Sequence, residues 1–266
     1  MRRLVMIGNG MAATRLAEKL VASAPGAFAI ALLGDEPHPA YSRIQLAPVL
    51  GGEKEFNQTL LQPARWYRVH HITQCLDETV LAVDVQARRV TATQRELEWD
   101  ELAFTCGSKA FLPPLPGIDL PHVFAFRTLA DVEAILATPG DAVVIGGGVL
   151  GVEAAAALRI RGDNVTLVHR SERLMEQQLD EMAGELLAQR LAERGIGCEL
   201  GAGIAQITPD AVVLNNGRAI AATRVVMATG VRPNIALAQR AGIHCQRGIV
   251  VNRQLETGIP GVSAIG

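Results

Sequence analysis

The 266-residue chain has few aromatic residues and no excess of charge of either sign. Aromatics make up 4% of the residues although 49% are hydrophobic, so Ala, Val, Leu and Ile must fill the core, as is usual where helices pack on parallel strands. Lys and Arg number 25 and Asp and Glu 27, which gives a net charge of −2. Such a balance offers no basic surface to a nucleic acid or an anionic membrane, so we expect neither as a partner.

Long apolar runs and closely spaced cysteines are also lacking. No apolar run approaches the roughly 20 residues that span a bilayer, and the first residues lead directly into a strand-like segment rather than a signal peptide. The four cysteines form no Cys-x-x-Cys pair, which argues against a disulfide framework. His70, His71 and Cys75 supply metal-ligand types without a fourth partner, so we expect no metal. A cytoplasmic protein is therefore expected.

One pattern occurs twice: an apolar strand, a glycine turn, an amphipathic helix and a second strand. In that order the copies cover 4–7, 8–10, 13–21 and 28–33, and then 142–145, 146–148, 149–161 and 164–168. Between them, the Pro-rich stretch 111–117 reads as a linker. We therefore expect an α/β protein with two Rossmann-like doubly wound domains.

Two further elements follow the second copy. A helix is predicted over 180–194, because apolar residues recur on one face and Gly195 ends it. The residues on that face are Leu179, Met182, Leu186, Leu187 and Leu191. The run 224–230 predicts another buried strand that ends in a glycine turn.

The first glycine turn fits the dinucleotide-binding pattern G-x-G-x-x-G/A. Gly8 would make the tight turn, Gly10 would let the backbone approach a pyrophosphate, and Ala13 would allow close helix packing. Unpaired backbone N–H groups at the helix start would hold the phosphate without Lys or Arg. Asp35 and Glu36 end the next strand, where a carboxylate accepts hydrogen bonds from ribose hydroxyls, and we favour Glu36.

The second turn, Gly146-Gly147-Gly148-Val149-Leu150-Gly151, has all three glycines. Its ribose position holds His169 and Arg170 instead of an acidic residue. Cations there would suit the 2′-phosphate of NADPH, but an exposed His-Arg pair at a strand end explains them equally well. The choice between NADH and NADPH therefore stays open.

Two dinucleotide sites in one chain favour electron transfer between two cofactors. A flavin and a nicotinamide would supply the hydride acceptor and donor, and the reaction itself would belong to them. The alternative from another class is a flavin-less nucleotide-binding module whose turns serve sensing or assembly.

Five short motifs are shared with a known family. They are Gly-Asn-Gly-Met at 8–11, Glu-Pro-His-Pro-Ala-Tyr-Ser-Arg at 36–43, Thr-Cys-Gly-Ser at 105–108, the second glycine turn with Glu153, and Ala-Thr-Gly-Val-Arg-Pro-Asn at 228–234. In these motifs the chain resembles the FAD-dependent pyridine nucleotide-disulfide oxidoreductases, in the branch of the rubredoxin reductases and the flavin module of NAD(P)H-dependent nitrite reductase large subunits. The segment 174–180 is similar to the nitrite reductase group and to electron-transfer subunits of assimilatory nitrate reduction.

The resemblance implies site residues, domains and a function. It places FAD against Gly8, Gly10, Met11, Ala13, Asp35, Glu36, Arg43, Thr105, Cys106 and Gly107. It places NADH or NADPH against Gly146, Gly148, Val149, Leu150, Gly151, Glu153, His169 and Arg170, with Gly230 where the two sites join. An FAD-binding domain over 1–111 and 242–266 would be interrupted by an NAD(P)H-binding domain over 112–241. Electrons would pass from NAD(P)H through FAD to a downstream Fe–S or siroheme domain or redox protein in nitrite or nitrate assimilation; a rubredoxin- or ferredoxin-type reductase is the alternative.

The sequence departs from the family pattern at three places. Ser42, with Ile44 and Gln45 close by, stands where disulfide-reducing relatives carry a redox cysteine, so we expect electrons to leave the flavin for an outside acceptor. Pro48 stands at the place of a lysine, which makes Arg43 the candidate cation for Glu153; these two are the catalytic candidates. Relatives continue beyond the final Ala-Ile-Gly, so we expect either a part of a larger reductase or a shortened chain.

Overall fold

The computed structural model describes residues 1–266 and contains two compact units. Unit 1 comprises Met1–Ser42, Thr59–Lys109 and Pro233–Gly266, and unit 2 comprises Arg43–Gln58 and Ala110–Arg232. The chain therefore passes between the units after residues 42, 58, 109 and 232. Strands β8 and β17, which pair with each other, contain the last two of these passages.

Unit 1 is built on a parallel sheet with the strand order β18-β7-β1-β2-β3, and α1 joins β1 to β2. A second, antiparallel sheet has the order β4-β5-β6. The elements that lie in this unit or end in it are β1 (Arg2–Ile7), α1 (Met11–Ser23), β2 (Phe28–Leu33), η2 (Phe56–Thr59), α3 (Ala64–Val69), β3 (Thr73–Cys75), β4 (Val80–Asp84), β5 (Arg89–Ala92), β6 (Glu96–Glu98), β7 (Glu101–Phe104), β8 (Ser108–Ala110), α7 (Ala236–Arg240) and β18 (Val262–Ala264).

The alternation of side chains along β1 divides the core of unit 1 between the two faces of its sheet. Leu4 and Met6 pack in one cluster with Ala13 and Ala17 of α1. Val5 and Ile7 belong to the cluster on the opposite face, together with residues of β7, the antiparallel sheet and α7. Both faces are thus buried, which explains why β1 is a continuous apolar run rather than an alternating one.

Unit 2 repeats this plan with the parallel order β12-β11-β10-β16-β9 and the antiparallel order β13-β14-β15. Helix α5 joins β10 to β11 as α1 joins β1 to β2. The elements are η1 (Arg43–Gln45), α2 (Leu46–Leu50), β9 (Val123–Ala125), α4 (Leu129–Ala137), β10 (Ala142–Ile145), α5 (Val149–Ile160), β11 (Val165–Val168), α6 (Glu181–Glu193), β12 (Ile196–Glu199), β13 (Ile204–Ile207), β14 (Ala211–Leu214), β15 (Ala219–Ala221), β16 (Arg224–Met227) and β17 (Val231–Pro233).

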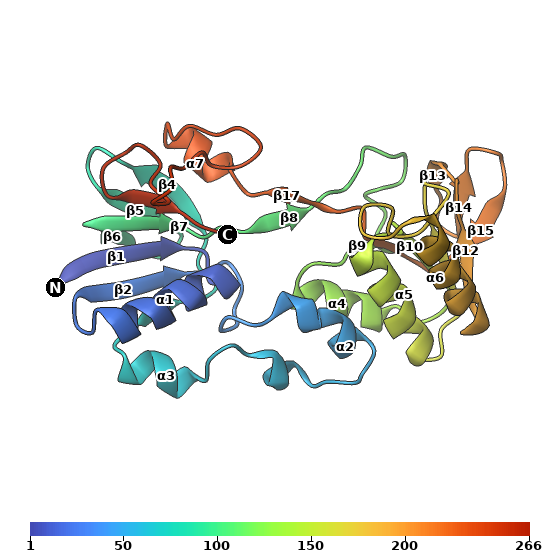
Figure 1. Cartoon of the computed structure of the whole chain (residues 1–266), viewed down its shortest axis with the longest axis horizontal. Helices are drawn as coiled ribbons and strands as arrows, with labels where there is room; N and C mark the ends of the chain where they lie inside the picture. The colour runs from blue at the N-terminus through green and yellow to red at the C-terminus, as the bar shows by residue number, and fades with distance from the viewer. The chain divides into compact units, whose positions relative to one another are not determined.

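In each unit the strand that precedes the glycine turn is central. β1 lies between β2 and β7, with parallel pairing on both sides (Figure 1). β10 likewise lies between β11 and β16, again with parallel pairing on both sides. The carboxyl ends of these strands therefore meet at one edge of each sheet, where doubly wound folds bind their ligands. The predicted fold class, α/β with two Rossmann-like units, is confirmed. None of the helices combines the length and the apolar character needed to cross a bilayer.

The unit boundaries differ from the domain boundaries expected from the sequence. Residues 43–58 fall in unit 2, because α2 packs against α4 and α5. A Cβ atom on Gly51 would lie 3.5 Å from Ala157 of α5. The return to unit 1 occurs after residue 232 rather than near 242, because α7 packs on β4 and supplies Leu237 and Ala238 to that core. Contacts distant in sequence set both boundaries.

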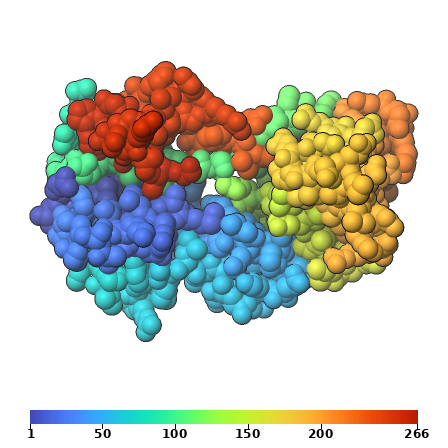
Figure 2. All heavy atoms as spheres, in the orientation of Figure 1, coloured from blue at the N-terminus to red at the C-terminus, as the bar shows by residue number.

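The apolar face predicted for the helix over 180–194 is wrong in part. Only Leu191 of the five named residues is buried, while Met182 is 80% and Leu186 is 51% exposed. Figure 2 shows the segment of α6, drawn in yellow, at the surface of the molecule. The helix packs through the small residue Gly184 and through Leu191, so the longer apolar side chains one turn apart point outward.

Candidate dinucleotide-binding sites

The turn after β1 is tight because Gly8 lies directly against the end of β7. Gly8 has φ +116°, and its N–H donates to the Leu33 carbonyl at 2.8 Å. A Cβ atom on Gly8 would be 2.2 Å from the carbonyl oxygen of Thr105. The Thr105 hydroxyl donates to the carbonyls of Ile7 at 3.0 Å and Gly8 at 2.8 Å. Thr105 therefore holds the turn in place, through its hydroxyl and through its backbone carbonyl. The sequence pattern alone did not predict this role.

Gly10 is free of such crowding. It has φ −117° and ψ −166°, which any residue adopts, and a Cβ atom there would meet nothing within 4 Å. Neither the backbone conformation nor packing requires glycine at this position. A side chain at this position would occupy the open space at the N-terminus of α1. A pyrophosphate that binds there needs this space to approach the backbone.

The N-terminus of α1 has no side-chain cap and no acidic residue in its first turn. The backbone N–H groups of Met11, Ala12 and Ala13 have no hydrogen-bond acceptor in the structure. These are the unpaired donors that hold a phosphate group at a helix start, with the helix dipole adding positive potential. The turn therefore fits a dinucleotide without any cationic side chain.

Capping elsewhere in the chain makes this absence informative. Helix α4 begins with a full capping box between Thr128 and Asp131, and α6 begins with Asp180, whose carboxylate accepts from the N–H of Ala183 at 2.9 Å. Among the helices of nine residues or more, α4 and α6 have side-chain caps, whereas α1 and α5, which follow the glycine turns, have none. The shorter helices α2, α3 and α7 are also uncapped. Uncapped ends at the carboxyl edges of two parallel sheets suit external anions.

Glu36 is held in place at the end of β2 by an aromatic side chain. The hydroxyl of Tyr41 donates to Glu36 Oε2 at 2.6 Å, and the Tyr41 side chain is buried. Asp35, in contrast, is exposed. The preference for Glu36 over Asp35 as the ribose residue stays a prediction, and the bond from Tyr41 supports it by orienting the carboxylate. Tyr41 itself was missed as a positioning residue, although it lies only five residues after Glu36.

Cys106 sits behind the same turn rather than on an open surface. Its thiol lies 3.4 Å from the Ile7 carbonyl and donates to it. Burial, with a smaller contribution from the charge of Asp35, raises the pKa of Cys106 to about 11. A thiol with this pKa is not a nucleophile at neutral pH, so Cys106 serves packing here. Next to it, Gly107 has φ +61° and accepts a hydrogen bond from the N–H of Asn234.

The turn after β10 repeats the main features of the first turn. Gly146 has φ +120°, and a Cβ atom on it would be 2.3 Å from the carbonyl oxygen of Ala228, which follows β16. Gly148 has φ −78° and, like Gly10, nothing within 4 Å of a Cβ atom. The N–H groups of residues 149–151 again have no acceptor. A Cβ atom on Gly151 would be 1.7 Å from the Gly146 carbonyl oxygen, so the third glycine is sterically required.

His169 follows β11 at the predicted ribose position, but its ring is already engaged. The side chain is 8% exposed, its Nδ1 accepts from the N–H of Gly147 at 3.0 Å, and its Nε2 lies 2.9 Å from Glu176 Oε2. Arg170 is exposed and has no partner. His169 is thus buried between the turn and Glu176 rather than open to a ligand. Glu176 was missed because seven residues separate it from His169.

The two catalytic candidates, Arg43 and Glu153, are not paired in unit 2. The guanidinium of Arg43 donates to the carbonyl of Arg127 at 2.8 Å. Glu153, on α5, has no hydrogen-bond or ionic partner, and desolvation raises the pKa of its carboxyl. The expected contact between Arg43 and Glu153 is therefore not formed, because Arg43 is turned toward the end of the segment that precedes α4. Their catalytic roles stay predictions.

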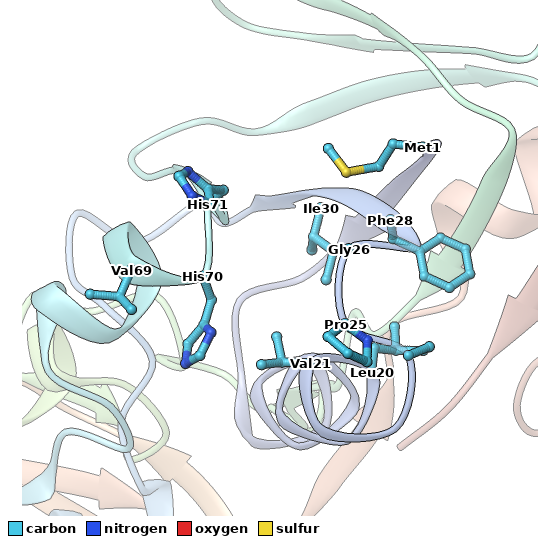
Figure 3. A pocket seen from close by; sticks show the side chains of 11 residues that line it. Met1, Leu20, Val21, Pro25, Gly26, Phe28, Ile30, Val69, His70 and His71 are labelled. Atoms are coloured by element: carbon cyan, nitrogen blue, oxygen red, sulfur yellow. The ribbon is translucent and has the colours of Figure 1, made fainter.

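A pocket of about 260 Å³ in unit 1 lies away from the glycine turn. Figure 3 shows Leu20 and Val21 of α1 on one wall and His70 and His71 on another. Met1 and Phe28, at the amino ends of β1 and β2, also line it, so the pocket opens at the opposite edge of the sheet from the turn. No group of three or more His, Cys, Asp or Glu residues is arranged to hold a metal ion.

Comparison with known proteins now identifies the family. The family model for pyridine nucleotide-disulphide oxidoreductases matches residues 2–266. The chain belongs to this family. The predicted class of enzyme, an oxidoreductase with FAD and a nicotinamide dinucleotide as cofactors, agrees with this family. The recognised resemblance is confirmed.

Two curated relatives and one solved structure illustrate the match. Nitrite reductase [NAD(P)H] of Bacillus subtilis is 40% identical, over 100% of this chain and 34% of the relative. The assimilatory nitrate reductase electron transfer subunit of the same organism is 38% identical, over 100% of this chain and 35% of the relative. The crystal structure of the ferredoxin reductase for the CYP199A2 system of Rhodopseudomonas palustris is 28% identical with a TM-score of 0.93, over 100% of this chain and 68% of that chain. The chain spans about a third of the length of the two curated relatives.

Proposed function

We propose that this chain is the FAD- and NAD(P)H-binding reductase part of an electron-transfer protein in nitrite or nitrate assimilation. The names of its two B. subtilis relatives support this assignment. Since those relatives are about three times as long, we propose that a further Fe–S or siroheme domain, or a separate redox protein, receives the electrons. The four free thiols suit a reducing compartment, and the proposal includes a cytoplasmic location.

The observation that carries the proposal is the pair of open glycines. Gly10 and Gly148 are required by neither conformation nor packing, and each stands before a helix start whose N–H groups lack acceptors. A pyrophosphate that approaches the backbone explains both features at both turns. One such turn would support a nucleotide-binding module, whereas two in one chain support a donor and an acceptor.

The residues of unit 1 fit FAD. The N–H groups of residues 11–13 would bind its pyrophosphate, and Glu36, oriented by Tyr41, would accept from the ribose hydroxyls. Thr105 would keep the turn in shape. In unit 2 the N–H groups of residues 149–151 would bind the pyrophosphate of the nicotinamide dinucleotide. When bound, FAD supplies hydride acceptance and onward release of electrons, and the protein supplies binding and orientation.

A titration with FAD tests the proposal. We expect the 266-residue chain to bind FAD with an absorbance band at ~450 nm that bleaches on anaerobic addition of NADH or NADPH. A chain that folds but binds no flavin would favour the nucleotide-binding module instead. If FAD binds but neither NADH nor NADPH reduces it, the assignment of unit 2 as the binding site of the hydride donor would be contradicted.

A second acceptor is supported by other relatives. Rhodocoxin reductase of Rhodococcus erythropolis is 34% identical, over 99% of this chain and 64% of the relative. A ferredoxin- or rubredoxin-type reductase is therefore the alternative function. Stopped-flow mixing of the NADH-reduced protein with a [2Fe–2S] ferredoxin or a rubredoxin distinguishes the two. Transfer on the millisecond timescale to the small carrier favours the alternative, and slow transfer favours an acceptor fused to or associated with the chain.

A further inference from the structure

The position that follows β11 sets which adenosine ribose a βαβ dinucleotide site accepts. An acidic side chain there binds the 2′-hydroxyl of NAD(H), and a cation accommodates the 2′-phosphate of NADP(H). The sequence places His169 and Arg170 at this point and leaves the choice open. The structure adds a third residue, Glu176, to this end of the strand.

The hydrogen bonds of His169 define its tautomer. Nδ1 accepts from the backbone N–H of Gly147 at 3.0 Å, so this nitrogen carries no proton. The proton of the neutral ring is then on Nε2, which donates to Glu176 Oε2 at 2.9 Å. A protonated ring would have to give up its bond from Gly147. His169 is therefore a hydrogen-bonded spacer between the glycine turn and a carboxylate, and neither ring nitrogen is free to bind a phosphate.

The loop that carries Glu176 is fastened to the same turn. The N–H of Met175 donates to the Gly147 carbonyl at 2.8 Å, and the neighbouring side chain of Leu174 is buried against Gly147. The hydroxyl of Ser171 donates to Glu176 Oε1 at 3.2 Å. Both carboxylate oxygens are thus oriented, and the side chain keeps 27% of its surface exposed. A held but accessible carboxylate can still accept further hydrogen bonds.

The charge state of Glu176 follows from these contacts. Burial raises the pKa of its carboxyl, but four contributions together outweigh burial: the hydrogen bond from His169, a backbone hydrogen bond, the electrostatic interaction with His169 and the hydrogen bond from Ser171. The pKa of Glu176 therefore lies below its usual value. Glu176 is therefore an anion at neutral pH. An anion beside the turn would repel a 2′-phosphate and would accept from ribose hydroxyls.

We propose that Glu176, positioned by His169, serves as the ribose-binding acid of unit 2 and selects NADH over NADPH. The inference rests on the proposed function, because it assigns the substrate of the same site. Arg170 is the competing cation. It is exposed and unpaired, so no contact orients its guanidinium. The neighbouring Arg173 is turned to the Glu176 carbonyl at 3.4 Å. The oriented group at this end of the strand is the carboxylate.

Binding of nucleotide fragments tests the inference without hydride transfer. Dissociation constants for ADP-ribose and 2′-phospho-ADP-ribose are measured by calorimetry for the wild type, Glu176→Gln and Glu172→Gln. Glu172 lies in the same loop and packs over Gly201, with no bond to His169, so its variant removes the same charge as a matched control. Gln at 176 keeps an oxygen for His169 and removes only the charge.

We expect the wild type to prefer ADP-ribose by about tenfold or more, which corresponds to one charge-assisted hydrogen bond and the absence of a repelled phosphate. Glu176→Gln should reduce that preference by about tenfold, mainly by tighter binding of the 2′-phosphorylated fragment, and Glu172→Gln should leave it within about twofold. The ratio of kcat/KM for NADH to that for NADPH should change in the same direction.

Salt dependence of the wild type gives a second measurement that needs no variant. If Glu176 repels the 2′-phosphate, the preference for ADP-ribose narrows as ionic strength rises. A preference for 2′-phospho-ADP-ribose, or equal effects of the two Gln variants, would overturn the inference and leave the proposed function intact. Failure of the folded wild type to bind either fragment would overturn both.

Discussion

The carbonyl oxygen of Thr105 lies 2.2 Å from the position that a Cβ atom on Gly8 would occupy. The same relationship holds in unit 2 between Ala228 and Gly146, at 2.3 Å. In each unit the strand beside the central one ends against the first glycine and forces the chain to turn outward. The second glycine of each turn, Gly10 or Gly148, is then left at the helix start with open space beyond it.

Replacement of Gly8 by Ala should destabilise the protein severely. The new side chain would have to adopt φ +116° and would clash with backbone atoms, so we expect a loss of about 2 kcal/mol or more in the free energy of unfolding. Gly26→Ala is the matched control, because Gly26 has φ +74° but nothing within 4 Å. It should cost only about 1 kcal/mol of backbone strain. Urea unfolding curves measure both, and equal losses would show that the contact with Thr105 does not matter.

Replacement of Gly10 or Gly148 by Ala should leave the stability of the protein unchanged but weaken nucleotide binding. Both positions have backbone angles open to any residue and no neighbour to clash with, so we expect the variants to unfold at the same denaturant concentration as the wild type. Nucleotide binding should weaken, because the added methyl group enters the space that a pyrophosphate needs.

The two variants separate the two sites. Gly10→Ala should raise the dissociation constant for FAD by about tenfold or more, and Gly148→Ala should do so for ADP-ribose, with little effect on the other ligand in each case. Calorimetric titration of each variant with each ligand gives the four values. Unchanged affinity in both variants would contradict the reading of the open glycines as ligand positions.

The sequence predicted the two turns well because their signals are local. A strand, a glycine turn and a helix follow one another within about 25 residues in each copy. The helix predicted over 149–161 is observed as Val149–Ile160, and the strand over 28–33 is observed as Phe28–Leu33. The steric requirements of the turn itself select glycine at positions 8 and 146. These two glycines could therefore be predicted from the local sequence pattern.

Features that depend on distant contacts were not predictable from the pattern. Residues 43–58 join unit 2 through packing of α2 on α4 and α5, which no local signal indicates. Arg224 begins the strand that was predicted as buried, and it is 2% exposed. Its guanidinium is bonded to the Ile135 and Thr138 carbonyls and paired with Asp163, partners that no local pattern indicates. The pairing of His169 with Glu176 belongs to the same group, since it requires a loop to fold back onto the turn.

Cys106 should be unreactive toward thiol reagents at neutral pH. Its pKa of about 11 and its burial leave little thiolate, so we expect alkylation by iodoacetamide at about pH 8 to be at least about a hundredfold slower than for a free cysteine. Labelling should increase with pH until the protein unfolds. Peptide mass spectrometry reports each cysteine separately. The partly exposed Cys245 serves as the internal comparison, and labelling of Cys106 at the rate of Cys245 would contradict a packing role.

Glu153 should lower stability at neutral pH. Desolvation raises the pKa of its carboxyl above the value of 4.5 expected in the unfolded chain, and no cation compensates it. The folded state therefore binds more protons than the unfolded state in the window above pH 4.5, so this group makes the free energy of unfolding decrease as pH rises through the folded pKa. Below pH 4.5 the carboxyl is protonated in both states and the penalty disappears.

Glu153→Gln should remove that penalty. We expect the variant to be more stable than the wild type at about pH 8, by less than about 1 kcal/mol because the residue is largely exposed, and equal to it at about pH 4. Glu185→Gln, an exposed and unpaired acid on α6, is the control and should change stability at neither pH. Thermal unfolding of the three proteins at the two pH values decides the matter. A stability loss in Glu153→Gln at about pH 8 would contradict a net desolvation penalty at this carboxylate.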